Sequence, residues 1–450
     1  MSIRVRIAPS PTGYLHIGTA RTALFNWLFA KKNKGQFILR IEDTDLERSS
    51  PEFEKNIIES LKWLGLNWDE GPVRQSERTK IYEKYITKLL EKNLAYWCAC
   101  TKEELEGERQ SMLAQGLAPV YNGKCRGKNL TKGEVIRFRV PSKKIHFNDL
   151  IRGKIEFDTN LIGDFSIAKN TRTPLYNLAV VIDDEEMSIS HVIRGEDHIP
   201  NTPRQLLLQT AFDFKHPHYA HLPLILDPDR SKMSKRFTAT AVAEYQKQGY
   251  LPEALVNFMA LLGWHPVDEH EILTMEELIE KFDLNRVQKA GAVFNVEKLN
   301  WMNSQYLKKL PEGEILKRLD WKNTGQNKKI AALFKERAKT LNDFQELTGF
   351  IFKLPEYSPD LLCWKNKSHS ETVKSLEMAA ELIKANKPEE IPIIAEKYGR
   401  GEIYWPLRAA LSGLKESPGP MELLDVLGKK ESLTRIKIAL GKLGDGGLGL

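Results

Sequence analysis

Two short stretches of the chain carry groups suited to binding phosphate. Residues 16–19 (HIGT) stand where a loop enters a predicted helix, so free backbone N–H groups and the helix dipole attract an anion there. Gly18 lacks a Cβ and lets the anion approach the main chain, and His16 can donate to a phosphate oxygen. Residues 231–236 (SKMSKR) form a basic loop much later in the chain. Either stretch alone is weak support for a site, because loop histidines and solvated basic loops are common.

The first stretch lies inside a predicted strand–helix–strand unit. Residues 4–7 alternate in polarity and predict a strand, which ends at the proline and glycine residues of positions 9–13. Apolar residues at helical spacing predict a helix from residue 19 to the lysines at 31–34, with Gly35 as its C-terminal cap. The apolar run 37–41 predicts a parallel strand that is buried on both faces. The sequence therefore predicts a βαβ unit of an α/β fold.

The composition indicates a protein of several domains without a membrane span. The chain has 450 residues, of which 41% are hydrophobic and 28% charged, enough for about two to four domains with real cores. A net charge of +7 permits a polyanionic partner but does not require one. The chain starts without an apolar signal segment and has only four cysteines, so we expect a cytoplasmic protein without a disulfide scaffold.

Further elements are predicted beyond the first unit. Residues 51–64 predict an amphipathic helix, and the apolar run LAVVID after Tyr176 predicts a strand in the second half of the nucleotide-binding fold. Residues 242–264 and 275–282 predict helices, and helical patterns dominate residues 310–450.

The more polar residues 76–177 form a predicted insert and contain a candidate metal site. Two short ligand pairs fit the coordination of a tetrahedral zinc ion: Cys98 with Cys100, and Tyr121 with Cys125. From the residues alone, three free cysteines are about as well supported as a zinc site. A metal here would be structural, because the sequence predicts no open ligand position and no nearby base.

HIGT and KMSKR together resemble the paired signature of the class I aminoacyl-tRNA synthetases. RIAPSPTGYLHIGTAR and RIEDTD, both near the N-terminus, resemble the glutamyl-tRNA synthetases in particular, and similar CxC and YxxxC patterns occur in zinc-bearing members of that family. The resemblance extends over nearly the whole chain, and the further matching stretches are YNLAVVIDD (176–184), HVIRGEDH (191–198), GYLPEALVNFMALLGW (249–264), FNVEKLNWMN (294–303) and PLRAALSG (406–413).

The resemblance implies a division of the α/β chain into four parts. A class I Rossmann-type catalytic domain is expected with an inserted acceptor-binding domain, followed by an all-α C-terminal anticodon-binding region. The expected bounds are 1–75 and 178–230 for the catalytic domain, 76–177 for the insert, 231–310 for the KMSKR loop with a stem-contact helical domain, and 311–450 for the anticodon-binding region.

The resemblance also implies ATP-dependent ligation of L-glutamate to tRNA-Glu through glutamyl-adenylate, with Mg²⁺ on the ATP phosphates. Arginine suits the amino acid because a planar guanidinium binds a carboxylate through two hydrogen bonds. The implied site residues are His16, Lys232 and Lys235 for catalysis; Gly18, Thr19, Glu196, Ser234 and Lys235 for ATP; Arg6, Ser10, Glu42, Tyr176 and Arg194 for glutamate; Cys98, Cys100, Tyr121 and Cys125 for zinc; and Arg48 and Arg337 for tRNA.

Several alternatives differ in what they require of the sequence. An enzyme that also charges tRNA-Gln stays open, since Arg337 alone cannot decide between anticodons. A tRNA-modifying paralogue should lack the C-terminal helical region, a nucleotidyltransferase leaves KMSKR unexplained, and a binding-only regulator should have lost His16, Lys235 or Arg194. We therefore expect a monomeric ligase that acts on tRNA, L-glutamate and ATP.

Overall fold

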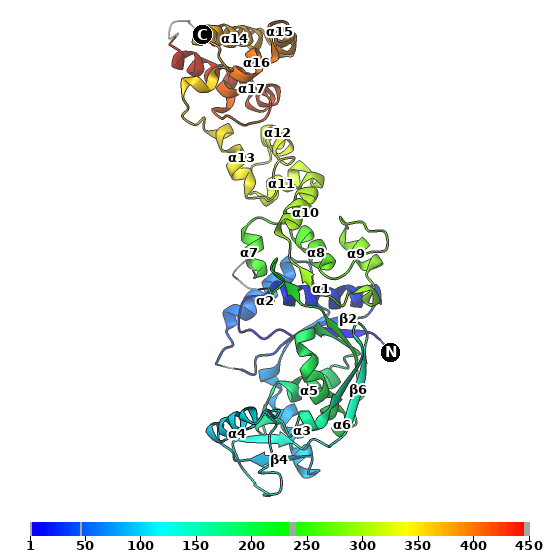
Figure 1. Cartoon of the computed structure of the whole chain (residues 1–450). Helices are drawn as coiled ribbons and strands as arrows, with labels where there is room; N and C mark the ends of the chain where they lie inside the picture. The colour runs from blue at the N-terminus through cyan, green and yellow to red at the C-terminus, as the bar shows by residue number, and fades with distance from the viewer. Residues whose placement is uncertain (1, 46, 234–239, 445–450) are drawn as a thin grey trace. The chain divides into compact units, whose positions relative to one another are not determined.

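The computed structural model describes residues 2–45, 47–233 and 240–444, and these residues form two compact units (Figure 1). The first unit comprises Met1–Lys247 and Pro252–Leu299, and the second comprises Gln248–Leu251 and Asn300–Leu450. Among the described residues, no helix is both long and apolar enough to cross a membrane.

The predicted βαβ unit forms the N-terminal sheet of the first unit. Strand β1 (Arg4–Ile7) pairs in parallel with β2 (Gln36–Ile41), which pairs in parallel with β3 (Glu70–Arg74). Helix α1 (Ile17–Lys32) connects the first two strands, and α2 (Pro51–Trp63) follows the second. The two predicted strands and the amphipathic helix are therefore confirmed.

The C-terminal end of α1 differs from the prediction. Asn33 is the cap residue, and Lys34 rather than Gly35 adopts the left-handed conformation, with φ of 52°. The N–H of Gly35 then donates to the carbonyl of Ala30 at 2.9 Å. Gly35 is needed for another reason, because a Cβ there would lie 2.4 Å from the carbonyl oxygen of Ile3. The prediction of Gly35 as the cap is wrong, although the helix does end beside it.

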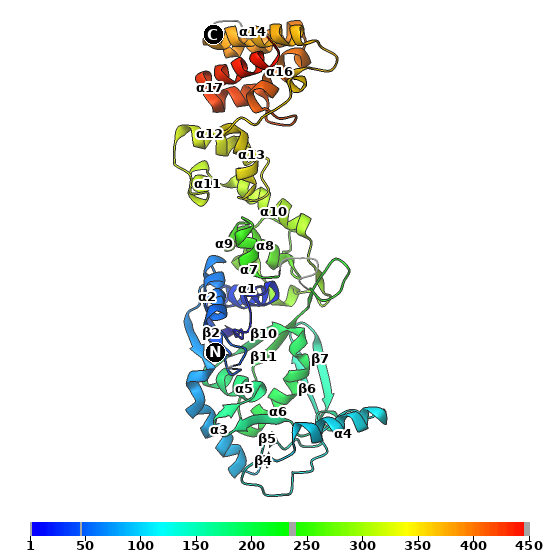
Figure 2. The same cartoon turned by 90° about the vertical axis from the view of Figure 1, so that its left-hand side faces the viewer.

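A second sheet has the strand order β10-β11-β6-β7 (Figure 2). Strand β10 (His191–Gly195) pairs in parallel with β11 (His218–Leu222), and β11 pairs in parallel with β6 (Lys144–Asp149). An antiparallel hairpin joins β6 to β7 (Gly153–Asp158). Strand β1 of the N-terminal sheet lies against β10, so the two sheets meet at their edges. Two strands from the expected insert, β6 and β7, thus complete a sheet of the expected catalytic domain.

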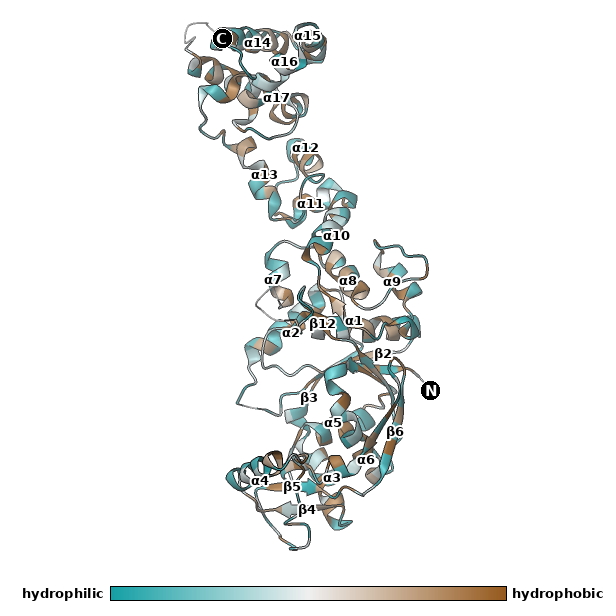
Figure 3. Ribbon diagram, in the orientation of Figure 1, coloured by the Kyte–Doolittle hydropathy of each residue, from teal (hydrophilic) through white to brown (hydrophobic). Residues whose placement is uncertain are grey.

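The remainder of the insert forms a small antiparallel sheet with two helices. Helix α4 is mostly polar and appears mostly teal in Figure 3; none of its described residues is fully buried, although Leu105 packs against the cysteine cluster. Its capping box explains why it begins where it does, since Thr101 and Glu104 each accept from the other's backbone N–H. The elements are β4 (Ala95–Cys98), β5 (Val135–Phe138), β8 (Ser166–Asn170), β9 (Thr173–Pro174), α3 (Thr79–Glu91) and α4 (Lys102–Ala114).

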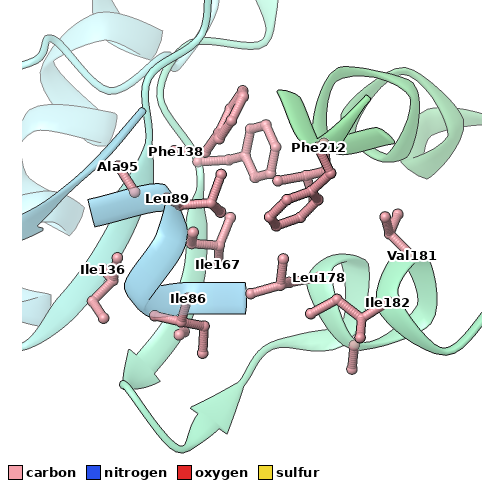
Figure 4. Packing of buried hydrophobic residues seen from close by; sticks show 14 of the residues in the cluster. Ile86, Leu89, Ala95, Ile136, Phe138, Ile167, Leu178, Val181, Ile182 and Phe212 are labelled. Atoms are coloured by element: carbon pink, nitrogen blue, oxygen red, sulfur yellow. The ribbon is translucent and has the colours of Figure 1, made fainter. Parts of the chain in front are cut away.

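The LAVVID run forms the helix α5 (Tyr176–Glu186), so the prediction of a strand is wrong. Residues 178–184 are all buried, so the run has no polar face that could reveal a helical period. Leu178 and Ile182 pack with Phe212 of α6 (Thr202–Phe212) in one apolar cluster (Figure 4). The same cluster includes apolar side chains of α3, β4, β5 and β8, and it fixes the insert to α5.

Beyond residue 223 the first unit becomes mainly helical. Strand β12 (Ile225–Leu226) pairs in parallel with β13 (Ala292–Val293). The predicted helix 242–264 is divided into α7 (Val242–Lys247) and α8 (Pro252–Leu261), because the intervening Gly249 has a φ of 80° and Pro252 starts a new helix. The prediction for residues 275–282 is confirmed by α9 (Met275–Lys281).

The regular elements among the described residues of the second unit are all helices, as predicted. Arg435 lies in its core, 1% exposed, and donates to the carbonyls of Phe350, Ile351 and Leu411 at 2.7–2.8 Å. The helices are α10 (Val296–Lys309), which begins in the first unit, α11 (Glu312–Arg318), α12 (Gly325–Phe334), α13 (Asp343–Phe352), α14 (His369–Lys384), α15 (Ile391–Tyr398), α16 (Arg400–Ser412) and α17 (Pro420–Lys442). Short 3₁₀ helices occur at Gln75–Arg78, Thr159–Leu161, Glu196–Asn201, Leu284–Arg286, Pro359–Leu362 and Pro388–Glu390.

Candidate active site

Helix α1 begins at the HIGT stretch, two residues earlier than predicted. His16 is its N-cap, and the Nδ1 atom of its ring accepts from the backbone N–H of Gly18 at 3.0 Å. Because Nδ1 is the acceptor, the proton of the neutral ring resides on Nε2. A Cβ on Gly18 would lie 3.3 Å from His16 Nδ1, so the glycine keeps room for this arrangement. The first turn carries no acidic side chain that would repel an anion.

A cavity of about 510 Å³ opens in front of this helix terminus. Its volume lies in the usual range of small-molecule sites, about 300–1,000 Å³. The cationic side chains that line it are Arg6, Arg21, Arg194 and Lys232, against the acidic Glu42 and Asp197. The excess of cationic groups favours anionic ligands. Of the predicted site residues, Arg6, Ser10, His16, Gly18, Thr19, Glu42, Tyr176, Arg194 and Lys232 all line this cavity.

Arg194 lies in one wall of the cavity and is 5% exposed. Its Nη2 atom donates to the hydroxyl of Thr202 at 2.8 Å, and its Nε atom donates to Nε2 of His221 at 3.2 Å. Its Nη1 atom is buried and has no hydrogen-bond partner among the described residues. A buried donor without a partner is costly, so Arg194 keeps unused hydrogen-bonding capacity beside the cavity that it lines, which suits an anionic ligand.

Tyr176 and His198 lie beside Arg194. The hydroxyl of Tyr176 is 2.9 Å from His198 Nδ1. Burial, together with the negative charge of Glu42, raises the pKa of Tyr176 to about 12, so the phenol stays protonated. Burial and the charge of Arg194 lower the pKa of His198 to about 4. Both side chains are therefore neutral at pH 7.

A network of buried ion pairs holds Glu42 in the wall of the cavity. Arg40 has no exposed surface and pairs with Asp184 at 2.7 Å and with Glu42 at 3.1 Å, while Arg6 pairs with Asp184 at 3.1 Å. Burial would raise the pKa of Asp184, but Arg6 and Arg40 hold it below its usual value. For Glu42 the burial effect exceeds the attraction of Arg40 and Arg6, and its pKa is raised.

The loop that carries Lys232 turns back toward the cavity after β12. Its backbone is held at Leu226, which forms a β-bridge with Lys232, and at Ile225, whose carbonyl accepts from the N–H of Met233 at 3.1 Å.

Glu196 is not among the described residues that line the cavity. Its carboxylate accepts from the N–H of Leu224 at 2.8 Å and pairs with Arg152 at 2.6 Å, so it supports the wall formed by residues 223–225.

Two predicted site residues, Ser234 and Lys235, lie outside the described residues. Neither of the two arginines predicted to contact tRNA is among the described residues that line the cavity. Arg48 is exposed and pairs with Asp45 at 2.6 Å. Arg337 is partly exposed, 4.0 Å from Glu422 in the second unit. Their predicted contacts with tRNA stay predictions.

The predicted metal ligands come together in the insert. Tyr121 Oη is 3.4 Å from Cys98 Sγ and 3.6 Å from Cys100 Sγ, and Cys100 Sγ is 3.6 Å from Cys125 Sγ. Tetrahedral zinc with bonds of about 2.3 Å separates its thiolates by about 3.8 Å, so the cluster fits zinc in ligand type and spacing. Burial opposes ionisation of Cys98, but hydrogen bonds from Tyr121 and from the backbone of Cys100 lower its pKa to about 7.

Sequence reasoning missed Arg40, Asp184, His221 and Asp149, which support the cavity from behind. Arg40 interrupts the apolar run of β2, and an ionisable residue within such a run signals a buried partner. Asp184 is the last residue of the matching stretch YNLAVVIDD. His221 and Asp149 carried no comparable local signal, because their role depends on the pairing of distant strands.

Family models match both parts of the chain. Residues 2–301 match the tRNA synthetases class I (E and Q), catalytic domain, and residues 296–440 match an anticodon binding domain.

Individual relatives match over almost the whole length. A glutamate–tRNA ligase of Carboxydothermus hydrogenoformans is 47% identical, covering 96% of this chain and 99% of that protein. A glutamate–tRNA ligase of Caldicellulosiruptor saccharolyticus is 44% identical and covers 97% and 99%. The crystal structure of a glutamate–tRNA ligase from Elizabethkingia meningosepticum in complex with its amino acid is 38% identical, with a TM-score of 0.88 and coverage of 98% and 100%.

The fold, the cavity and the matched models define a class I aminoacyl-tRNA synthetase. Within that class, the chain belongs to the glutamate–tRNA ligases.

Proposed function

We propose that this chain ligates L-glutamate to tRNA-Glu in two ATP-dependent steps through glutamyl-adenylate. One observation carries the proposal: a single cavity has a buried, unpartnered guanidinium edge of Arg194 in its wall and the N-terminus of α1 at its mouth. The first feature suits a carboxylate and the second suits a phosphate. A ligase that joins an acidic amino acid to a nucleotide needs both.

The amino acid occupies the end of the cavity formed by Arg194, Tyr176, Arg6, Glu42 and Ser10 in this proposal. Arg194 receives the side-chain carboxylate, and Glu42 receives the ammonium group. Glutamine would leave the cationic edge of Arg194 against a neutral amide, and a site built for a charge rejects such an analogue strongly. The buried position of both charged residues supports this selectivity, because electrostatic interactions are stronger away from water.

In the first step, the α-carboxylate of glutamate attacks the α-phosphorus of ATP. A carboxylate–phosphate bond forms, the bond to the β-phosphate breaks, and pyrophosphate leaves. No general base is needed because the carboxylate is ionised at pH 7, so positioning and charge stabilisation supply the catalysis. His16, Gly18, Thr19 and the α1 N-terminus serve the α-phosphate, and Lys232, Ser234 and Lys235 serve the leaving pyrophosphate.

In the second step, a ribose hydroxyl at the 3′ end of tRNA attacks the activated carbonyl. An ester bond forms, the bond between the carbonyl carbon and the phosphate oxygen breaks, and AMP and the hydroxyl proton leave. Mg²⁺ arriving with ATP would neutralise phosphate charge in the first step, as it does in most nucleotide sites. Glu196 acts on ATP indirectly in this proposal, since its carboxylate holds the cavity wall at Leu224.

We assign the remaining predicted roles by position. The insert at 76–177 binds the acceptor end, residues 231–310 contact the stem, and residues 311–450 bind the anticodon, with Arg48 and Arg337 as tRNA contacts. Zinc held by Cys98, Cys100, Tyr121 and Cys125 would cross-link two loops of the insert. The enzyme acts as a monomer in the cytoplasm, where ATP and tRNA are available.

A charging assay tests the proposed function. Purified protein is incubated with ATP, Mg²⁺, labelled glutamate or glutamine, and transcripts of tRNA-Glu or tRNA-Gln. We expect glutamate to be attached to tRNA-Glu, and His16→Ala to lower kcat by about 10²- to 10³-fold, the usual effect of losing one donor to developing charge. His270→Ala is the matched control, because His270 is 74% exposed and lies outside the cavity lining of the described residues.

Each outcome of this assay has a distinct meaning. Charging of tRNA-Gln with glutamate as well would define a non-discriminating enzyme and correct the tRNA specificity proposed here. Attachment of glutamine, or of neither amino acid to either tRNA, would refute the proposal.

A further inference from the structure

Two fully buried side chains lie directly behind Arg194 in the second sheet. His221 of β11 is the register partner of Arg194 in β10, and Asp149 closes β6 beside β11. The side chains of His221 and Asp149 are both 0% exposed. They do not line the cavity formed by the described residues, so neither touches a ligand there.

The hydrogen bonds between these residues have a defined direction. His221 Nδ1 is 2.6 Å from Asp149 Oδ2, and an ionised carboxylate only accepts, so Nδ1 carries a proton. Burial and the charge of Arg194 lower the pKa of His221 despite its contact with Asp149, so the ring is neutral at pH 7. The lone pair of the neutral ring is therefore on Nε2, which accepts from Nε of Arg194 at 3.2 Å and also lies 3.1 Å from the hydroxyl of Thr202.

Asp149 is itself fixed by the backbone. Its Oδ1 atom accepts from the N–H groups of Ile151 at 2.9 Å and Arg152 at 2.8 Å. Its Oδ2 atom faces the ring of His221 and also accepts from the backbone N–H of His221 at 3.1 Å. The carboxylate cannot rotate without losing these bonds, so the orientation of the imidazole is set by the main chain of the β6–β7 hairpin.

The consequence for Arg194 is a guanidinium that is held on two of its nitrogens. The Nε atom of Arg194 donates to His221 and the Nη2 atom donates to Thr202, while the Nη1 atom has no hydrogen-bond partner among the described residues. A long side chain that lines a cavity has many rotamers, and fixing it in one of them costs side-chain entropy. Here the protein fixes the rotamer before any ligand binds.

We propose that Asp149 and His221 are positioning residues that orient Arg194 for the side-chain carboxylate of glutamate and thereby set the preference for glutamate over glutamine. The inference rests on the proposed function of Arg194 as the carboxylate reader. Asp149 fixes the tautomer of His221, and His221 fixes the guanidinium. Neither residue takes part in the chemical steps.

A pair of substitutions at His221 tests the proposal. His221→Phe keeps a ring of similar size but removes the acceptor for Arg194. His221→Gln offers an amide oxygen to Arg194 and an amide N–H to Asp149. We expect His221→Phe to raise KM for glutamate by about 10- to 100-fold, the effect of losing a buried hydrogen bond to a charged group, and His221→Gln to restore most of the loss. The KM for ATP and kcat should change little in either variant.

Asp149→Asn gives a second, independent test. The backbone N–H groups around Oδ1 require the amide oxygen there, so the amide NH₂ faces His221 Nδ1. The ring must then move its proton to Nε2, which opposes the N–H of Arg194. We expect KM for glutamate to rise and the ratio of kcat/KM for glutamate over glutamine to fall by about 10-fold or more. Asp164→Asn is the matched control, a buried aspartate of the insert whose Oδ2 accepts from Tyr96 at 2.7 Å.

The results separate the inference from the proposed function. If the unsubstituted enzyme does not charge tRNA with glutamate, the proposed function fails. If it does charge tRNA, equal KM values for glutamate in the unsubstituted enzyme, His221→Phe and His221→Gln overturn the positioning role. An equal rise of the KM values for glutamate and ATP, or an unchanged glutamate-to-glutamine ratio in Asp149→Asn, would indicate general packing and would also overturn it.

Discussion

At the scale of single residues, the cavity depends on charges that are buried behind it. Arg40 has no exposed surface and contacts both Asp184 and Glu42, while Arg6 shares Asp184. Buried ion pairs add little stability compared with apolar packing, but removing one partner is costly because the other charge is left alone. The pairs therefore explain how Glu42 and Arg6 can be kept at a cavity wall, not why the protein is stable.

Asp184→Asn should lower the free energy of unfolding by about 3–5 kcal/mol at pH 7, because Arg6 then stays buried without its paired carboxylate and Arg40 keeps only Glu42. Arg6 and Arg40 hold the pKa of Asp184 below its usual value, against the effect of burial. Its stabilisation is thus fully present above the pKa of the unfolded chain, about 3.9, and is lost as the pH falls through the lower folded value.

Urea titrations of both proteins at a series of pH values measure this difference, which should shrink below about pH 4. Asp425→Asn is the control, because Asp425 is 62% exposed and its contact with Lys329 lies at the surface. A surface pair contributes at most about 1 kcal/mol. A difference between Asp184→Asn and the unsubstituted protein that stays constant down to the lowest pH would contradict the role given to this carboxylate.

At the scale of elements, the start of α1 combines a helix terminus with a histidine cap. Gly18→Ala should keep or raise the stability of the helix, since alanine is favoured over glycine by up to about 1 kcal/mol. The added Cβ would lie 3.3 Å from His16 Nδ1 and shift the ring. We expect kcat/KM for tRNA charging to fall by roughly 100-fold, as small displacements at reacting groups do.

Melting temperature and charging rate, measured on the same preparation, test the Gly18 prediction. Gly349→Ala serves as the control, because Gly349 lies within α13 and a Cβ there meets nothing within 4 Å. That variant should gain stability without losing activity. Loss of stability and activity together in Gly18→Ala would mean that the glycine serves folding rather than the site.

Local patterns predicted the elements that have a polar side or a clear end. The strands β1 and β2, the helix α2 and the position of the HIGT loop follow directly from alternation, helical spacing and turn residues. Helix α5 could not be distinguished from a strand, because residues 178–184 are buried on every side. Periodicity carries information only where one face meets water.

The residues behind the cavity needed information that the sequence does not display locally. Arg194, Glu42 and Tyr176 were predicted through the resemblance to a family, and the structure places all three in the cavity lining. His221 and Asp149 reach Arg194 only because β11 lies between β10 and β6. Strand order is a property of the folded chain, so these residues emerged only from the structure.

At the scale of the whole molecule, the chain consists of two compact units. Such chains need not unfold in one step. We therefore predict two transitions in differential scanning calorimetry. Arg435→Ala should lower the transition of the second unit by removing the donor to the carbonyls of Phe350, Ile351 and Leu411, a loss of about 3 kcal/mol or more.

The same scans supply the controls. Asp184→Asn should lower only the transition of the first unit, and Arg400→Ala should move neither, because Arg400 is 75% exposed. A single transition that both Arg435→Ala and Asp184→Asn shift by the same amount would show that the two units unfold as one.

The β6–β7 hairpin has a consequence for how this enzyme can be recombined with its relatives. Residues 76–177 form one continuous segment that could be exchanged as a cassette, but the segment contributes strands to two sheets. Strands β4, β5, β8 and β9 form the small antiparallel sheet, whereas β6 and β7 belong to the sheet of β11. Exchanging the cassette at two crossover points would replace Asp149 and leave β11 beside foreign strands or with an open edge. An exchange between relatives must therefore transfer the small antiparallel sheet and the β6–β7 hairpin behind Arg194 together, or use four crossover points so that β6 and β7 stay with β11.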